Sequence, residues 1–159
     1  MKSWAQKKKV QIRSPDATRP WQHVLEPLSG YLSLGMQLGE DHRLHGESFN
    51  FGPKAEQNRS VLQLLSDLSK FWDFEAEADA YEVTDRIPFH EAGLLKLNCD
   101  KALFHLHWES NLAYNDCVQL VSEWYFNFYS RKKDPYQLTV ENIDAYERAA
   151  KLKNLVWTK

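Results

Sequence analysis

Residues 13–38 constrain this chain most, because they combine a turn, a pair of arginines and an apolar helix. A short apolar run at 10–12 precedes them and predicts a strand. The proline after Arg19 biases that residue toward an extended conformation. We expect the turn at 14–16 to bring Arg13 and Arg19 back toward each other.

Two arginines in one loop suit a phosphate group, since each guanidinium is a planar, permanently charged donor of forked hydrogen bonds. Trp21 would add a flat apolar wall to such a site. The same spacing also fits two solvated surface arginines beside a packed tryptophan. The local sequence leaves both interpretations open.

Composition places the chain among globular proteins, with 159 residues, 43% hydrophobic and 13% aromatic, enough for one domain with its own core. The net charge of -2 gives no reason to expect nucleic-acid binding. Cys99 and Cys117 form no C-x-x-C motif, which favours unpaired thiols in the cytoplasm. No apolar run approaches the roughly 18 residues of a membrane span, and none follows the basic N-terminus as in a secretory signal.

Hydrophobic periodicity predicts a helix-rich α+β fold with short strands. Helices are expected at about 25–38, 61–72 and 101–106, from an Asn115 cap to about 129, and from a Thr139 cap onward. Strands are expected at 10–12, 47–51, 81–84 and 94–97. The last two helices are expected to bury Cys117, Val121, Trp124, Tyr125, Phe128, Val140, Ile143, Tyr146 and Ala150.

The helix expected at 25–38 contains Gly30 and Gly35, which each weaken it by about 1 kcal/mol relative to alanine. That cost is tolerable if a neighbouring element packs closely there. Leu28, Tyr31 and Leu32 share one face of this helix.

The run IRSPDATRPWQHVLEPLSGYL at 12–32 closely resembles the segment that distinguishes CDP-glucose 4,6-dehydratases within the extended short-chain dehydrogenase/reductase superfamily. Related nucleotide-sugar enzymes carry Arg-Asp-Trp at this turn, so Pro20 points to the CDP-glucose branch. The resemblance continues through 47–53, 90–92, 100–102 and 123–125 and covers nearly the whole chain. It matches only the C-terminal part of such enzymes.

The resemblance implies that residues 1–159 form one substrate-binding region without the N-terminal Rossmann half, and that 1–9 are the tail of a helix from that half. Met1 would then begin inside a longer parent fold. In the family, NAD serves to oxidise CDP-glucose at C4, water is eliminated between C5 and C6, and the hydride returns to C6. The product, CDP-4-keto-6-deoxyglucose, leads to sugars of the lipopolysaccharide O-antigen.

The catalytic parts of that reaction are missing here. None of the six glycines forms G-x-x-G-x-x-G. Tyr129 and Lys133 have the spacing of the catalytic Tyr-x-x-x-Lys pair, but they lie at a helix end with no cofactor site upstream. We therefore expect this chain alone to bind no NAD and to show no dehydratase activity.

The resemblance assigns nucleotide contacts to residues on several segments. Arg19 aligns with an arginine that contacts the diphosphate, Asn50 with an asparagine that reaches the same region, and Arg13 lies where the family lines the base pocket. Taken alone, Asn50 also fits an ordinary polar group at a strand edge.

His90 and Glu91 align with a loop that follows a proline, where a glutamate can accept from ribose hydroxyls. Relatives often have Arg at the position of Ile87, and Phe89 is an extra residue, so this loop departs from the family pattern. Without the resemblance, His90 fits a backbone hydrogen bond and Glu91 fits the cap of a turn.

The expected partners follow from the missing half. They are CDP-glucose or a related nucleotide sugar, an N-terminal Rossmann half, or a second copy, because Leu28, Tyr31 and Leu32 would lie uncovered without the cofactor domain. Two alternatives remain: a non-catalytic protein that pairs with a separately encoded N-terminal half, and a degenerate remnant.

Histidine spacing adds two smaller predictions. His42 with His45, and His105 with His107, have spacings that a metal could use, but neither pair has a third ligand, so we expect no metal site. His107 also occupies the left-handed position that ends a helix, where the resembled family has glycine.

Overall fold

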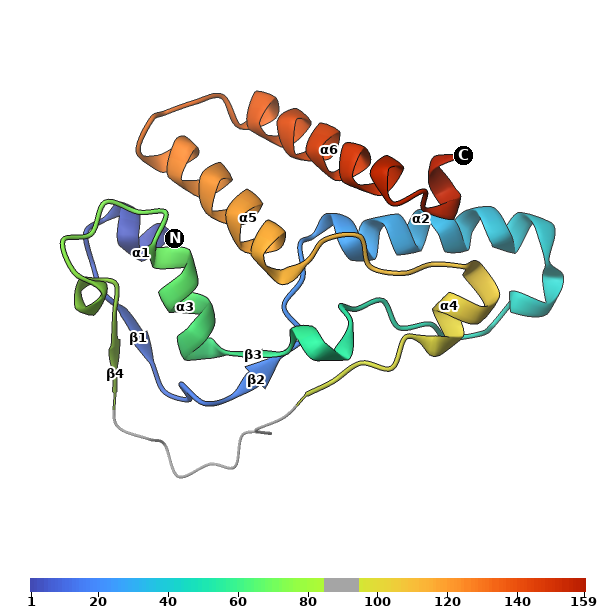
Figure 1. Ribbon diagram of the computed structural model, residues 1–159, viewed down its shortest axis with the longest axis horizontal. Coiled ribbons are helices and arrows are strands. Elements are labelled where there is room, and N and C mark those ends of the chain that lie inside the picture. The colour runs from blue at the N-terminus through green and yellow to red at the C-terminus, as the bar shows by residue number, and fades with distance from the viewer. Residues whose placement is uncertain (85–94) are drawn as a thin grey trace.

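The computed structural model describes residues 1–84 and 95–159 and confirms a helix-rich α+β arrangement with short strands (Figure 1). Its α-helices are α1 (Lys2–Ala5), α2 (Leu25–Glu40), α3 (Val61–Ser69), α4 (Asp100–Leu106), α5 (Tyr114–Tyr129) and α6 (Pro135–Leu152). Its 3-10 turns are η1 (His42–Leu44), η2 (Ala55–Gln57), η3 (Glu77–Asp79) and η4 (Val156–Thr158). Its strands are β1 (Val10–Ile12), β2 (Thr18–Arg19), β3 (Arg59–Ser60) and β4 (Tyr81–Val83).

The described strands form two separate two-stranded sheets. β1 pairs with β4 in parallel, with Val10 opposite Tyr81, and the intervening chain supplies the long crossover that a parallel pair needs. β2 pairs with β3 in the antiparallel sense, with Arg19 opposite Arg59. The second sheet was not predicted, because two residues per strand leave no alternation to detect.

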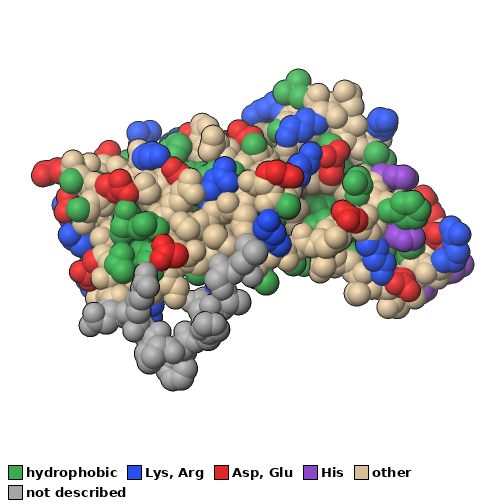
Figure 2. All heavy atoms as spheres, turned by 60° about the horizontal axis from the view of Figure 1, so that its bottom comes forward, with side chains coloured by type: hydrophobic (Ala, Val, Ile, Leu, Met, Phe, Trp, Pro, Cys, Tyr) green, Lys and Arg blue, Asp and Glu red, His purple; other side chains and the backbone are tan. Residues whose placement is uncertain are grey.

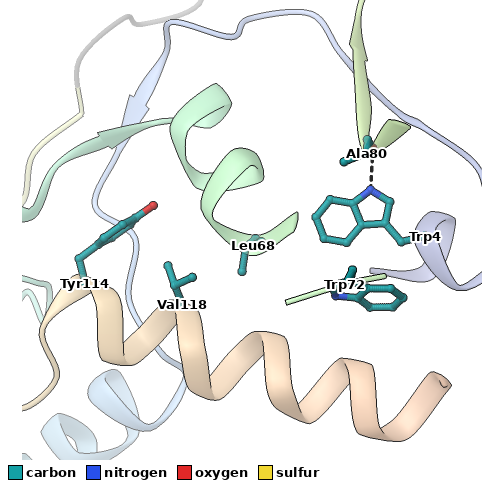
Figure 3. Packing of buried hydrophobic residues seen from close by; sticks show 6 residues of the cluster. All are labelled: Trp4, Leu68, Trp72, Ala80, Tyr114 and Val118. Atoms are coloured by element: carbon teal, nitrogen blue, oxygen red, sulfur yellow. Dashed lines mark hydrogen bonds between the residues drawn. The ribbon is translucent and has the colours of Figure 1, made fainter. Parts of the chain in front are cut away.

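The first hydrophobic core gathers side chains from α1, α3 and α5, and from the residues just after α3 and just before β4 (Figure 3). Trp4 is buried, its Nε1 donates to the Ala80 carbonyl at 2.6 Å, and its ring meets Trp72 edge-to-face at 5.5 Å. The one-turn helix α1 is therefore fixed to the rest of the fold through Trp4. The other buried members of this core are Leu68, Tyr114 and Val118.

The second core lies between α2 and α4 and contains Leu44, Phe51, Ala102, Leu106 and Trp108. A Cβ added to Gly30 would lie 2.3 Å from Cδ1 of Phe51, so the condition of a closely packed neighbour is met at this glycine. No neighbouring element packs in this way on Gly35, because no described atom outside the backbone of its own helix lies within 4 Å of its would-be Cβ.

Two predicted strands are wrong. Residues 47–51 have no strand partner in the described chain, although their alternation is that of a strand. Residues 95–97 also form no strand, and Leu94 lies outside the described residues. Strand assignment needs a hydrogen-bonded neighbour, which sequence alternation alone cannot supply.

Two predicted helix caps are also wrong. Helix α5 begins before Asn115, and the Asp116 carboxylate accepts from the Ala113 N–H at 3.2 Å. Helix α6 begins at Pro135 with Asp134 as its cap, because an Asp-Pro pair starts a helix more strongly than a later threonine. Thr139 instead lies inside α6.

The buried faces of α5 and α6 differ in part from the prediction. Tyr125 and Ile143 are exposed, whereas Ser122 and Leu138 are buried. Tyr146 and Ala150 are buried as predicted, and Trp157 of η4 stacks on Tyr146 at 5.8 Å, so the C-terminal residues dock on α6.

His107 ends α4 as predicted. It has a φ of 51° in the left-handed region, and the N–H of the next residue, Trp108, donates to the Ala102 carbonyl at 3.3 Å.

Candidate functional site

The candidate anion site is built on the β2–β3 ladder. Arg19 and Arg59 lie directly opposite each other, which places two like charges on one face of the sheet. Nη1 of Arg19 donates to the Thr18 carbonyl at 2.8 Å. Nη1 of Arg59 donates to the carbonyls of Glu56 and Asn58 at 3.1 and 3.0 Å.

Arg59 is the site residue that sequence reasoning missed. It also lies over the Tyr114 ring at 5.1 Å, which holds its guanidinium against α5. The local sequence carries no signal for its role, because Arg19 and Arg59 are brought together by strand pairing across 40 positions of chain.

The residues that follow Arg19 tie this ladder to the Asn50 segment. Nε1 of Trp21 donates to the Arg59 carbonyl at 2.9 Å, and Nε2 of Gln22 donates to the Phe51 carbonyl at 3.1 Å. Trp21 is half-buried against the first core. Trp21 is therefore better described as a packed side chain than as an apolar wall of an anion site.

Asn50 is exposed, and its Nδ2 donates to the Asn98 carbonyl at 3.2 Å. Asn98 lines a hollow of about 590 Å³ formed by residues 52–56, 96–100, Leu103 and 108–110. The structure thus links the segments of Arg19 and Asn50 through Gln22, with an open hollow beside the second.

The remaining predicted site residues lie further off or outside the description. Arg13 is exposed just after β1, and a turn closed by the Ala17 N–H and the Ser14 carbonyl, at 3.2 Å, separates it from Arg19. Its approach to Arg19 stays a prediction. His90 and Glu91 lie outside the described residues.

A buried carboxylate connects α2 with two other parts of the fold. Glu26 of α2 is 1% exposed and accepts from the N–H groups of Asn111 and Leu112, at 2.9 and 2.6 Å, and from the Tyr146 hydroxyl at 3.0 Å. Burial raises the pKa of Glu26, while those donors and the charge of Lys153 oppose the rise. Glu26 therefore joins α2 to residues 111–112 and to α6.

Cys117 lies near this carboxylate and is no candidate nucleophile. Burial, with the nearby charges of Glu26 and Asp116, raises the pKa of Cys117 to about 12. A thiol reacts as its thiolate, so this one stays unreactive at neutral pH.

His23 lies two residues before the start of helix α2 and is 5% exposed. Its Nδ1 accepts from the Leu25 N–H at 3.2 Å, so the neutral ring carries its proton on Nε2. Burial lowers the pKa of His23. The side chain acts as a helix cap only in its neutral form.

The lowered pKa of His23 predicts a loss of stability in mild acid. Below the unfolded pKa of about 6.5 the unfolded chain binds this proton more readily than the folded one, so stability falls as the pH drops toward the folded pKa. His23→Asn keeps an acceptor for the Leu25 N–H but does not titrate. Urea unfolding from pH 5 to 8 should give a flatter profile for this variant than for the parent.

His107→Asn is the matched control, because it replaces an exposed histidine at a position where asparagine is also tolerated. Equal slopes for His23→Asn and the parent would show that His23 does not couple folding to pH.

The described residues contain neither a cluster of metal ligands nor a membrane-spanning helix. Figure 2 shows histidine side chains gathered at one end of the molecule. The rings of His42 and His45 meet at 5.0 Å. Residues 1–84 and 95–159 contain no group of three His, Cys, Asp or Glu side chains placed to hold a metal ion. Across the same residues, no helix is both long and apolar enough to cross a membrane.

Comparison with known proteins finds a similarity to part of an enzyme. No protein-family model matches the chain. The chain is 32% identical over 125 residues to the CDP-glucose 4,6-dehydratase of Salmonella typhimurium. The match covers 79% of this chain and 34% of that enzyme. The chain thus resembles, over most of its own length, about a third of an enzyme that acts on a nucleotide sugar.

Proposed function

We propose that this chain is the nucleotide-sugar-binding portion of a CDP-glucose 4,6-dehydratase-like protein, with the substrate diphosphate held between Arg19 and Arg59. The observation that carries the proposal is the direct opposition of these two arginines across the β2–β3 ladder. The similarity to the Salmonella enzyme supports the choice of a nucleotide sugar over other anions.

The charges suggest how the nucleotide lies. A diphosphate offers only acceptors, and two guanidiniums supply forked donors that cannot lose their charge. Asn50 adds an uncharged amide on a linked segment. Glu91 would repel a phosphate but suits a ribose hydroxyl, so we place it, with His90, at the nucleoside end, and Arg13 at the base.

NAD belongs to the other part of the proposed enzyme, where it would supply the hydride transfer. Its pyrophosphate needs a glycine-rich turn between a strand and the start of a helix. In the described residues, α2 follows β2 through 20–24 and α3 follows β3 directly, and neither connection contains glycine. These residues do not fit NAD. Within this proposal the chain only binds and orients the nucleotide sugar.

A second role, as the docking surface for a Rossmann half, is favoured by the exposed face of α2. Leu28, Tyr31 and Leu32 are 44, 60 and 72% exposed, which confirms their predicted exposure. Apolar patches of several hundred Å² commonly mark interfaces. The two alternatives are self-association through this face and a remnant that binds no ligand.

Arg19→Ala should abolish detectable CDP binding. We expect the parent chain to bind CDP with a Kd near 1 mM, about -4 kcal/mol, because the sugar end and the cofactor half contribute nothing. Loss of a charge-assisted hydrogen bond should weaken this roughly 10- to 150-fold. NMR chemical-shift titration with CDP measures both.

Arg148→Ala removes an exposed arginine from α6 and is the matched control, which should titrate like the parent. Arg59→Ala should behave like Arg19→Ala. The diphosphate site is misplaced if Arg19→Ala retains the parent affinity, or if the shifts cluster away from the β2–β3 ladder.

A further inference from the structure

A hollow of about 370 Å³ opens where α5 and α6 lie beside the start of α2 (Figure 1). Each of α5 and α6 lines it at i, i+3 and i+4 spacing, so each turns one helical face toward it. Its size lies within the range of small-molecule sites. The lining residues are 23–25, then Val121, Trp124 and Tyr125 of α5, and Thr139, Asn142 and Ile143 of α6.

Apolar side chains around this hollow stay uncovered. Val24, Tyr125 and Ile143 are exposed, although helical periodicity predicts that the last two are buried. The described chain therefore leaves the apolar faces of α5 and α6 open at this point. Because the uncovered surface is concave and has three sides, it fits a small molecule better than the flat surface of another protein.

The aromatic wall of the hollow is held in place by its neighbours. The Trp124 ring stacks on Phe128 at 5.3 Å and meets the Tyr125 ring edge-to-face at 5.0 Å. Nε1 of Trp124 donates to Oγ1 of Thr139 at 3.2 Å, which joins α5 to α6 beside the hollow. Binding would not have to order these side chains, so little affinity is lost to conformational entropy.

His23 and Asn142 supply a pair of hydrogen-bond donors. His23 is buried, and its Nδ1 accepts from the Leu25 N–H, so its Nε2 carries the proton. Nδ2 of Asn142 lies 3.5 Å from this Nε2, longer than the roughly 2.9–3.0 Å of a usual hydrogen bond. Both atoms are donors in this arrangement, so neither satisfies the other. One acceptor atom near both would receive two hydrogen bonds.

The charge of the hollow favours an uncharged ligand. Lys, Arg, Asp and Glu are absent from the described residues that line it. A charged ligand would lose its hydration there without gaining an ion pair, whereas an apolar ring would gain from burial against Trp124 and Ile143.

We infer that this hollow between α2, α5 and α6 binds an uncharged aromatic molecule that carries a carbonyl group, with the carbonyl oxygen accepting from His23 and Asn142. The ring would then lie against Trp124 and the apolar residues of the two helices. Arg19, Arg59 and Asn50 are not among the lining residues, so the inference does not depend on the proposed function.

Benzamide, an uncharged ring with one carbonyl group, is the probe for the first test. NMR titration of the whole chain should give a Kd of about 10 mM or tighter, with shifts confined to 23–25, 121–125 and 139–143. CDP should not displace benzamide. Shifts that cluster elsewhere, no saturation in this range, or displacement by CDP overturns the inference.

Filling the hollow gives the second test. Ile143→Trp places a larger ring at its mouth and should abolish benzamide binding. Leu152→Trp is the matched control, because Leu152 is exposed on the same helix but does not line the hollow, and it should titrate like the parent. If Ile143→Trp also titrates like the parent, benzamide binds at another place and the inference is wrong.

The third test concerns the carbonyl group. Asn142→Leu removes the amide at nearly constant size and should weaken benzamide roughly 2- to 10-fold, the loss of one hydrogen bond. Toluene, which has the ring without the carbonyl, should bind this variant at least as tightly as it binds the parent. An unchanged benzamide affinity, or an equal loss for both ligands, shows that Asn142 does not recognise a carbonyl and overturns the ligand assignment.

Discussion

Glu26→Ala is expected to lower the free energy of unfolding by about 3–5 kcal/mol, because it removes a buried carboxylate that accepts hydrogen bonds from two buried backbone N–H groups and a hydroxyl. The variant leaves two buried donors, the N–H groups of Asn111 and Leu112, without this acceptor, whereas the Tyr146 hydroxyl keeps the Ser29 hydroxyl at 2.9 Å. Each unpaired buried donor costs about 1–3 kcal/mol when no water reaches it. Urea unfolding followed by tryptophan fluorescence measures the loss.

Glu26→Gln removes the negative charge but keeps nearly the same size and shape of side chain. It keeps one acceptor oxygen but turns the other into an NH2 group that faces donors, so a loss of about 1–3 kcal/mol is expected. Glu40→Ala, at the exposed end of the same helix, should change stability by no more than about 0.5 kcal/mol. If Glu26→Ala lowers the free energy of unfolding by no more than Glu40→Ala does, then Glu26 does not stabilise the contact of α2 with residues 111–112 and α6.

Much of the fold was predictable because its signals are local. The apolar spacing of α2, the Ser60 cap of α3 and the short apolar runs of β1 and β4 all lie within a few residues of the elements they specify. The 47–51 segment shows the limit of such local signals. Its alternation correctly indicates one buried and one exposed side, but pairing depends on a neighbour that the described chain does not provide.

The candidate site was less predictable because its contacts are distant in sequence. Arg19 was found by resemblance, whereas Arg59 acquires its place only through the β2–β3 register. Helical periodicity treats a glutamate as a solvent-facing residue, so it gave no reason to bury Glu26. The N–H donors that make this burial possible come from 85 and 86 positions further along the chain.

Gly30→Ala should destabilise the chain by about 1–3 kcal/mol, although alanine is the better helix former by about 1 kcal/mol. The new Cβ would lie 2.3 Å from the Phe51 ring. That ring cannot move aside freely, because Trp108 and Tyr31 meet it edge-to-face at 4.9 and 5.6 Å. Steric overlap therefore outweighs helix propensity at this position.

Gly35→Ala on the same helix is the matched control and should have the opposite sign. No described atom outside the backbone of its own helix lies within 4 Å of its would-be Cβ, so the variant should gain up to about 1 kcal/mol from helix propensity alone. Urea midpoints of the two variants, compared at equal m-values, give the two signs directly. A loss at both positions would mean that Gly35 also lies against a neighbour in solution, and a gain at both would mean that α2 does not press on Phe51.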